Sequence, residues 1–189
     1  MFHGYLVYSN ALWWLVGVSV AMSIIVFLRK KEPRRWLSKR DWNHRRNIDR
    51  SYRHVARMVG MNGGQKTWYL RNKVTNQEFE EIVLTALKLK GLDIRRNEKY
   101  TGDGGVDGIV FVGGEKIIIQ SKRYNGPIQK AHVNSFIALV EAQGGRGLFV
   151  TCGRSSEPIR LICREHDRIT LISGRKLDWL LDHEQPWSW

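Results

Sequence analysis

Cysteine is scarce in this sequence, and the two residues present follow no metal-binding pattern. Cys152 and Cys163 lie in or near apolar runs, without the spacing of metal ligands. We expect both to be buried, reduced thiols, as is usual in a cytosolic domain. The histidines add no obvious chemistry, because His132 and His166 have no partners at catalytic spacing, and we expect both on the surface.

Acidic residues are also few, and their deficit gives the chain a strong positive charge. There are 18 Asp and Glu against 31 Lys and Arg, a net charge of +13 over 189 residues. The usual partners of so basic a chain are nucleic acid and anionic lipid. The excess is uneven, since Arg29 to Arg57 carries 12 basic and 3 acidic residues and the following segment is only mildly basic.

The first 28 residues contain no Asp, Glu, Lys or Arg, and 11–28 are almost wholly apolar. This length suffices for one transmembrane helix, so we expect a membrane anchor over 1–28. A cleaved signal peptide fits poorly, because there is no positive start and no small-residue cleavage site before Arg29. A buried core helix would need a partner to cover Trp13 and Trp14.

A basic cluster that begins at Arg29 follows this apolar run directly. By the positive-inside rule it predicts a single-pass protein of the cell inner membrane, with its C-terminal domain in the cytoplasm. Residues 29–66 then form a basic juxtamembrane linker, which would lie on anionic lipid, follow a phosphate backbone or act only as a topology signal. The globular domain is expected over 67–189.

The stretch 100–124 predicts a β-hairpin around which the domain is organised. The β-branched runs at 109–112 and 116–119 meet at Gly113 and Gly114, a typical two-residue turn. With that turn, residues pair across the hairpin when their numbers sum to about 227.

In this register Asp107 faces Gln120, at the open end of the hairpin. Side chains alternate along a strand, so Gln120 and Lys122 lie on one face and Ser121 on the other. A carboxylate, an amide and an ammonium group therefore converge within a short distance, and strand packing alone has little use for such a set.

The helix before the hairpin begins with a capping box, Thr75 to Glu78, and ends at Gly91. Within it, Glu80 has apolar neighbours at the next turns and is expected to face inward, where a carboxylate needs a cation or hydrogen bonds. Glu81 has more polar neighbours and is expected in solvent.

The remaining pattern alternates strands with helices after a three-strand start. It predicts an α/β fold with a mixed β-sheet covered on both faces. The expected elements are a strand at 92–100, a helix from Pro127 to Gly144, a strand at 147–152, a helix at 155–166, a strand at 169–173 and a helix at 175–183.

The residues that converge at the hairpin suit a metal-dependent phosphodiesterase. Carboxylate and carbonyl oxygens, here from Asp107, Gln120 and Glu80, are the ligands that Mg²⁺ prefers. Lys122 would orient or deprotonate the attacking water and add positive charge where negative charge develops. Gln120 lacks the charge of a carboxylate, which shifts metal binding toward Glu80.

At these residues the chain resembles the Mrr-like branch of the PD-(D/E)xK nuclease superfamily, the restriction endonuclease domains that carry Gln in place of the acid. The resemblance covers roughly residues 76–182, and the segments that carry it are Glu78-Phe-Glu80, Gly102 to Asp107, Gln120 to Tyr124, Gly147 to Gly153 and Ile169 to Gly174.

This resemblance implies a restriction-endonuclease-like αβββαβ core, DNA as substrate and Mg²⁺ as cofactor, with Mn²⁺ as the alternative. It implies Asp107, Gln120, Lys122 and Glu80 as catalytic residues. The implied metal ligands are Glu80, Asp107 and the backbone carbonyl of Ser121. Asp103 matches a loop aspartate of the family whose role is less defined.

The chain departs from the family at its start, where an anchor and a basic linker replace the separate DNA-recognition domain that Mrr-type enzymes often carry. Three hypotheses follow: a membrane-anchored DNA endonuclease acting in restriction, a tethered DNA-binding protein without cleavage, and a membrane scaffold. Arg123, Lys130 and Arg154 flank the site as candidate DNA contacts. Double-strand cutting by a single-site domain usually needs two copies, which suggests a homodimer.

Overall fold

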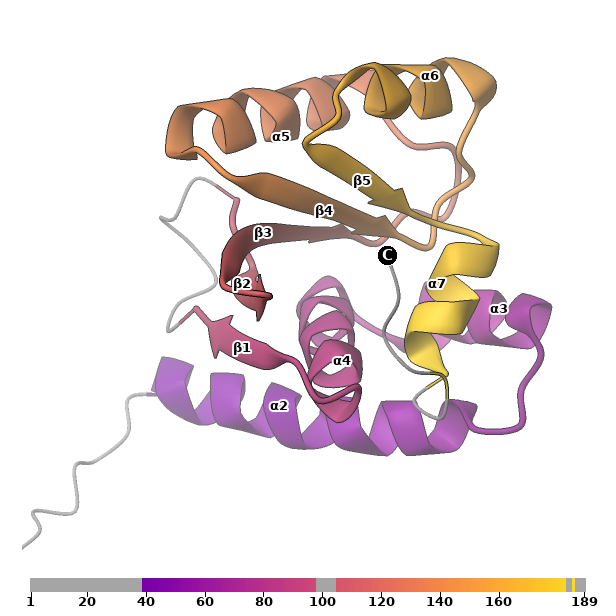
Figure 1. The fold of residues 1–189 in the computed structure, drawn as a ribbon. Helices are drawn as coiled ribbons and strands as arrows, with labels where there is room; N and C mark the ends of the chain where they lie inside the picture. Colours follow the sequence, from indigo (N-terminus) through magenta and orange to yellow (C-terminus); the bar gives the residue numbers. More distant parts are fainter. Residues whose placement is uncertain (1–38, 98–104, 183–184, 186–189) are drawn as a thin grey trace, which may run out of the picture. The chain divides into compact units, whose positions relative to one another are not determined.

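The computed structural model describes residues 39–97, 105–182 and 185, with side chains from Asp41 onward. The expected anchor at 1–28 and the loop aspartate Asp103 lie outside these residues. Within the described part, no helix is both long and apolar enough to cross a membrane. Figure 1 shows the arrangement of the helices and strands.

Five strands form one mixed sheet in the order β1-β2-β3-β4-β5. The first three are antiparallel neighbours, and β3, β4 and β5 run parallel. Their bounds are β1 Asp93–Arg96, β2 Gly108–Val112, β3 Glu115–Lys122, β4 Arg146–Thr151 and β5 Ile169–Ile172. The predicted mixed sheet is confirmed, although β1 is shorter than the expected strand at 92–100.

The hairpin register is also confirmed. Val112 pairs with Glu115 and Gly108 pairs with Ile119. Gly113 and Gly114 have φ angles of 57° and 85°, the left-handed values that a tight two-residue turn of this kind requires at both positions. The pairing ends at Gly108, so Asp107 stands just beyond the strand.

Helices cover both faces of the sheet, as Figure 1 shows. On one face, α4 (Asn76–Leu89) packs on β3, while on the other α5 (Lys130–Gln143) packs on β4 and α6 (Glu157–Glu165) on β5. The core element order is α4-β1-β2-β3-α5-β4, which is the expected αβββαβ order. Two further helices, α3 (Gly63–Lys73) and α7 (Arg175–Leu181), lie beside each other.

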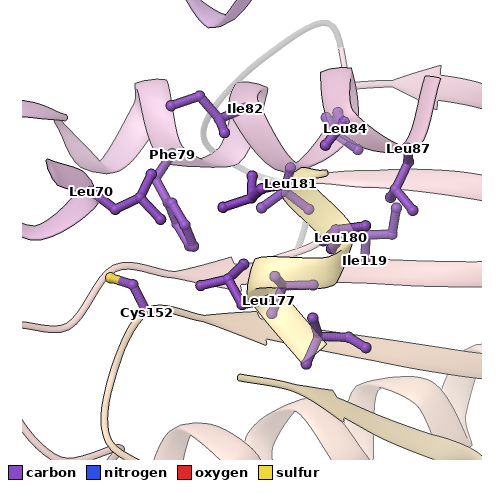
Figure 2. Packing of buried hydrophobic residues seen from close by; sticks show 14 of the residues in the cluster. Leu70, Phe79, Ile82, Leu84, Leu87, Ile119, Cys152, Leu177, Leu180 and Leu181 are labelled. Atoms are coloured by element: carbon purple, nitrogen blue, oxygen red, sulfur yellow. The ribbon is translucent and has the colours of Figure 1, made fainter. Parts of the chain in front are cut away.

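The core consists of two hydrophobic clusters separated by the sheet. The cluster on the α4 side, shown in part in Figure 2, joins α4, α7 and α3 to one face of β3 through residues such as Phe79, Leu177 and Leu70. The cluster on the other side contains the expected stripe of α5, namely Val133, Phe136, Ile137 and Val140. Cys152 and Cys163 are buried free thiols, as predicted, and burial raises the pKa of both.

The segment expected to be a linker forms α2 (Lys39–Met58), which packs against α4. Its residues Val55 and Met58 belong to the core cluster on the α4 side. α2 belongs to the same compact unit as the sheet, so the described part of this unit starts before residue 67, the boundary that the sequence suggested. Charged residues dominate the composition of α2. A few apolar residues at helical spacing are nevertheless enough to pack it against α4.

Candidate active site

Asp107 is fixed at the open end of the hairpin by two hydrogen bonds. Its backbone N–H donates to the carbonyl of Ile119 across 2.9 Å, which extends the pairing of β2 and β3 by one step. Its carboxylate oxygen Oδ2 accepts a hydrogen bond from the backbone N–H of Ser121 at 2.5 Å. The carboxylate is therefore held beside the residue that lies between Gln120 and Lys122.

Gln120 is held by the loop that leads into β2. Its Nε2 donates to the carbonyl oxygen of Gly105 across 2.6 Å, and the side chain is buried. Because Nε2 is used in this bond, the carbonyl oxygen Oε1 is the group left to face a cation. The structure thus brings Asp107 and Gln120 to the same end of the hairpin, as the register predicted.

The buried isoleucines of β3 show which of its residues lie on each face of the sheet. Ile117 and Ile119 belong to the cluster on the α4 side, and Ile118 belongs to the cluster on the α5 side. By alternation, Ser121 lies on the α4 face, and Gln120 and Lys122 lie on the α5 face. Lys122 pairs with Thr151 of β4 and is half-buried.

Glu80 comes from α4, which covers the opposite face. Leu84, one turn along the helix, lies against Gly108, and Asn76 at the helix start accepts a hydrogen bond from Arg123 at 3.0 Å. Glu80 stands midway between these two contacts and therefore lies at the same end of the sheet as Lys122. Its side chain is half-buried. Ser121 is the residue of the motif that lies on the face covered by α4.

The expectation that Glu81 is solvated is wrong. This residue is only 2% exposed, and its carboxylate pairs with Arg96 and with Nε2 of His44 at 2.9 Å. The helix α2 covers this side of α4, and the local sequence of α4 carries no sign of that partner. The neighbouring Glu78 is also buried and accepts a hydrogen bond from Arg50 of α2 at 3.0 Å.

The three candidate DNA-contacting cations differ in their surroundings. Lys130 and Arg154 are exposed at the start of α5 and after β4. Arg123, in contrast, donates to the Asn76 side chain, to the Arg71 carbonyl at 2.5 Å and to Asn125 at 3.0 Å. These bonds tie the end of β3 to α3 and α4.

His132, expected on the surface, is half-buried and has a partner that the sequence did not indicate. Its Nδ1 forms a hydrogen bond with the hydroxyl of Tyr124, and the two rings stack with centroids 5.8 Å apart. Burial raises the pKa of Tyr124, against a smaller lowering by a hydrogen bond with Gln129. His166 lies 3.8 Å from the carboxylate of Glu141 on α5.

The oxygen groups at the hairpin end fit a divalent cation of the Mg²⁺ type. No cluster of three or more His, Cys, Asp or Glu side chains occurs within the described residues. Two carboxylates nonetheless suffice for Mg²⁺, which keeps several waters. The hydroxyl of Ser121 is buried without a hydrogen-bond partner among the described residues, so an unsatisfied polar oxygen lies next to the anchored carboxylate of Asp107.

Comparison with known proteins places this geometry in a family. The family model Mrr_cat, restriction endonuclease, matches residues 71–181. This range holds α4, the hairpin and all four catalytic candidates, Glu80, Asp107, Gln120 and Lys122. The chain therefore belongs to the Mrr_cat restriction endonuclease family, and its domain is of the nuclease class. Restriction endonuclease domains generally use divalent metal ions.

The chain is similar to the type IV methyl-directed restriction enzyme EcoKMrr of Escherichia coli (strain K12). The two are 29% identical over 117 residues, which cover 58% of this chain and 38% of that protein. Among solved structures, the MspJI restriction endonuclease in complex with a 27-mer oligonucleotide has a TM-score of 0.40 and 17% identity. The similarity covers 74% of this chain and 31% of the MspJI chain. The chain thus spans well under half of either protein.

Proposed function

We propose that this protein is a metal-dependent DNA endonuclease that hydrolyses phosphodiester bonds in the restriction of foreign or modified DNA. The proposal rests mainly on the geometry at the open end of the hairpin. There the Asp107 carboxylate is hydrogen-bonded to the backbone N–H of Ser121, between Gln120 and Lys122. The match to the restriction endonuclease family and the similarity to a methyl-directed restriction enzyme support this substrate class.

The metal site would be formed by Asp107, Glu80 and the backbone carbonyl of Ser121, with Mg²⁺ as the expected ion and Mn²⁺ as the alternative. A bound divalent ion makes water more acidic and neutralises charge on a scissile phosphate. Gln120 would contribute its amide oxygen as a neutral group, and its bond to Gly105 fixes that orientation. Lys122 would hold the attacking water and stabilise the negative charge that develops on the phosphate.

We further propose that residues 1–28 anchor the protein in the cell inner membrane and leave the nuclease domain in the cytoplasm. The support is the uncharged apolar run followed directly by basic residues. A homodimer is proposed for double-strand cleavage.

The alternative function is a membrane-tethered DNA-binding protein that does not cleave. One observation favours it: Gln120 replaces a carboxylate, so the catalytic candidates supply only two acids, Asp107 and Glu80. A site with fewer carboxylates binds a divalent cation less tightly, and a low metal occupancy would leave a domain that holds DNA without cutting it.

Plasmid cleavage by the full-length chain in detergent separates the two functions. Supercoiled plasmid, unmethylated and methylated, is incubated with Mg²⁺, with Mn²⁺ or with EDTA, beside Asp107→Ala. Nicked or linear product that requires the metal and is lost in the variant supports the endonuclease. Retention of intact plasmid on the wild-type protein under every condition supports the tethered binder.

A further inference from the structure

A groove of about 790 Å³ opens beside the predicted active site, at the carboxyl ends of the parallel strands. Its lining comes from three places: α3, the residue Asn125 that follows β3, and Gly174 with the α7 residues Arg175 and Asp178 after β5. Figure 1 shows α3 and α7 beside the arrowheads of β4 and β5. This is the edge of an open α/β sheet where ligands usually bind, and the volume suits a nucleotide-sized group.

Trp68 of α3 is the one aromatic residue among the described residues that line this groove. Its side chain is 57% exposed although it is large and apolar. The ammonium group of Lys73 lies 5.8 Å from the centre of its ring, and both residues are on the solvent side of α3. An exposed tryptophan beside a cation is the combination with which proteins stack an unpaired base and hold its phosphate.

The charge of the groove favours an anion. Asp178 lines it, but this carboxylate is paired with the ammonium group of Lys66 at 2.7 Å. Arg71 also lines it, yet its guanidinium is bonded to the carbonyl of Cys152. Arg175 is exposed in the lining and leaves a net positive charge beside Trp68.

The position of the groove relative to Lys122 is set by the chain itself. Asn125 is three residues beyond Lys122, so the two are at most about 10 Å apart. Successive stacked bases of a DNA strand rise by about 3.4 Å, so Asn125 lies no more than about three nucleotides from Lys122. Arg123 fixes the geometry, because its bonds to Asn76, Arg71 and Asn125 hold the end of β3 against α3 and α4.

We propose that this groove binds an unpaired nucleotide of the substrate strand, with the base stacked on Trp68 and the phosphates held by Arg175 of the lining and by Lys73, which lies next to Trp68. Its Asn125 side lies within about three nucleotides of Lys122. The inference rests on the proposed nuclease function, which it deepens. It predicts a preference for DNA that is single-stranded or locally unpaired next to the cleavage position.

The test uses the full-length chain in detergent, with EDTA to prevent cleavage, and a fluorescently labelled single-stranded oligonucleotide. Trp42 on α2 offers a matched control, because it is 53% exposed and has Arg46 at 4.7 Å from its ring. We expect Trp68→Ala to weaken binding about tenfold, the usual effect of removing one stacked base. Trp42→Ala should retain wild-type affinity, and Trp68→Phe should retain most of it.

A second readout locates the stacked base. In oligonucleotides that carry 2-aminopurine at successive positions, one position should be quenched by the wild-type protein and not by Trp68→Ala. Equal affinity of Trp68→Ala and Trp42→Ala, or no binding of single strands by the wild type, would overturn the inference. A protein that binds through Trp68 but never cleaves contradicts only the nuclease proposal, and one that cleaves without dependence on Trp68 contradicts only the groove.

Discussion

The carbonyl oxygen of Gly105 accepts a hydrogen bond from Nε2 of Gln120 across 2.6 Å, and no side chain fits between them. A Cβ atom added at Gly105 would lie 2.5 Å from that nitrogen. The φ angle of Gly105 is +91°, in the region that favours glycine. Through this contact the residue Gly105, just before β2, positions the amide of Gln120.

Gly105→Ala is therefore expected to displace the Gln120 side chain and to lower the cleavage rate by about tenfold or more, since misplacement of a catalytic group by about 1 Å is costly. Gly126→Ala is the control, because a Cβ at Gly126 meets nothing within 4 Å. Single-turnover cleavage of both variants gives the comparison. Equal rates would show that Gln120 does not need this contact.

Two adjacent acids of α4 should separate stability from activity. Glu81→Ala leaves Arg96 and His44 without their buried partner, and the loss of one member of such a pair costs about 3 to 5 kcal/mol of folding free energy. Glu80 is only half-buried, so Glu80→Ala should cost less folding free energy than Glu81→Ala, and it should abolish cleavage. Urea unfolding and plasmid cleavage measured on both variants would contradict this assignment if Glu80→Ala were the one that unfolds.

Deletion of α2 is expected to abolish cooperative folding. The fragment 62–189 retains the cap of α3 but loses Val55 and Met58 from the core, and it exposes the buried acids Glu78 and Glu81. The fragment 38–189 retains α2 and should unfold in one transition. Thermal unfolding followed by circular dichroism compares them, and two equal transitions would show that α2 is dispensable.

The stability of the domain should fall on acidification below neutral pH, in part because of His54. Burial lowers its pKa below the ordinary 6.5, against a smaller raising by Glu78. Below pH 6.5 the unfolded chain takes up a proton at this position more readily than the folded one, so protonation favours unfolding.

Glu78, which raises the pKa of His54, adds a second loss of folding stability at lower pH. Burial acts to raise the pKa of Glu78, but hydrogen bonds from Thr75, together with His54 and Arg50, lower it overall below 4.5. Its stabilising effect is present above pH 4.5 and is lost as the pH falls through the folded value. Unfolding free energies of wild type and His54→Asn between pH 7.5 and 5.5 test the first step. An unchanged slope in the variant would contradict it.

Features that depend on neighbours in the chain could be predicted from the sequence. The Gly113-Gly114 turn fixed the register of β2 and β3, and the capping box of Thr75 and Glu78 fixed the start of α4. Both follow from hydrogen bonds that close within a few residues.

Features that depend on a distant element could not be predicted in this way. The local pattern of α4 distinguished Glu80 from Glu81 incorrectly, because the environment of Glu81 comes from His44 on α2 and Arg96 on β1. The basic residues of α2 concealed its packing for the same reason. The bond between His132 and Tyr124, and the intramolecular bonds of Arg123, likewise depend on where separate elements meet.

We assign Lys122 to phosphodiester cleavage, and Lys116 of the same strand offers a matched comparison. Lys116 is exposed near the opposite end of β3, where its ammonium group lies 3.5 Å from the side-chain oxygen of Gln143. Single-turnover cleavage of plasmid DNA with Mg²⁺ is measured for the wild type, Lys122→Ala and Lys116→Ala. We expect Lys122→Ala to lose cleavage by at least about a hundredfold, as removal of a charge-stabilising group typically does, while Lys116→Ala cuts at the wild-type rate. Equal cleavage by the two variants would contradict the assignment of the active site to the end of the hairpin.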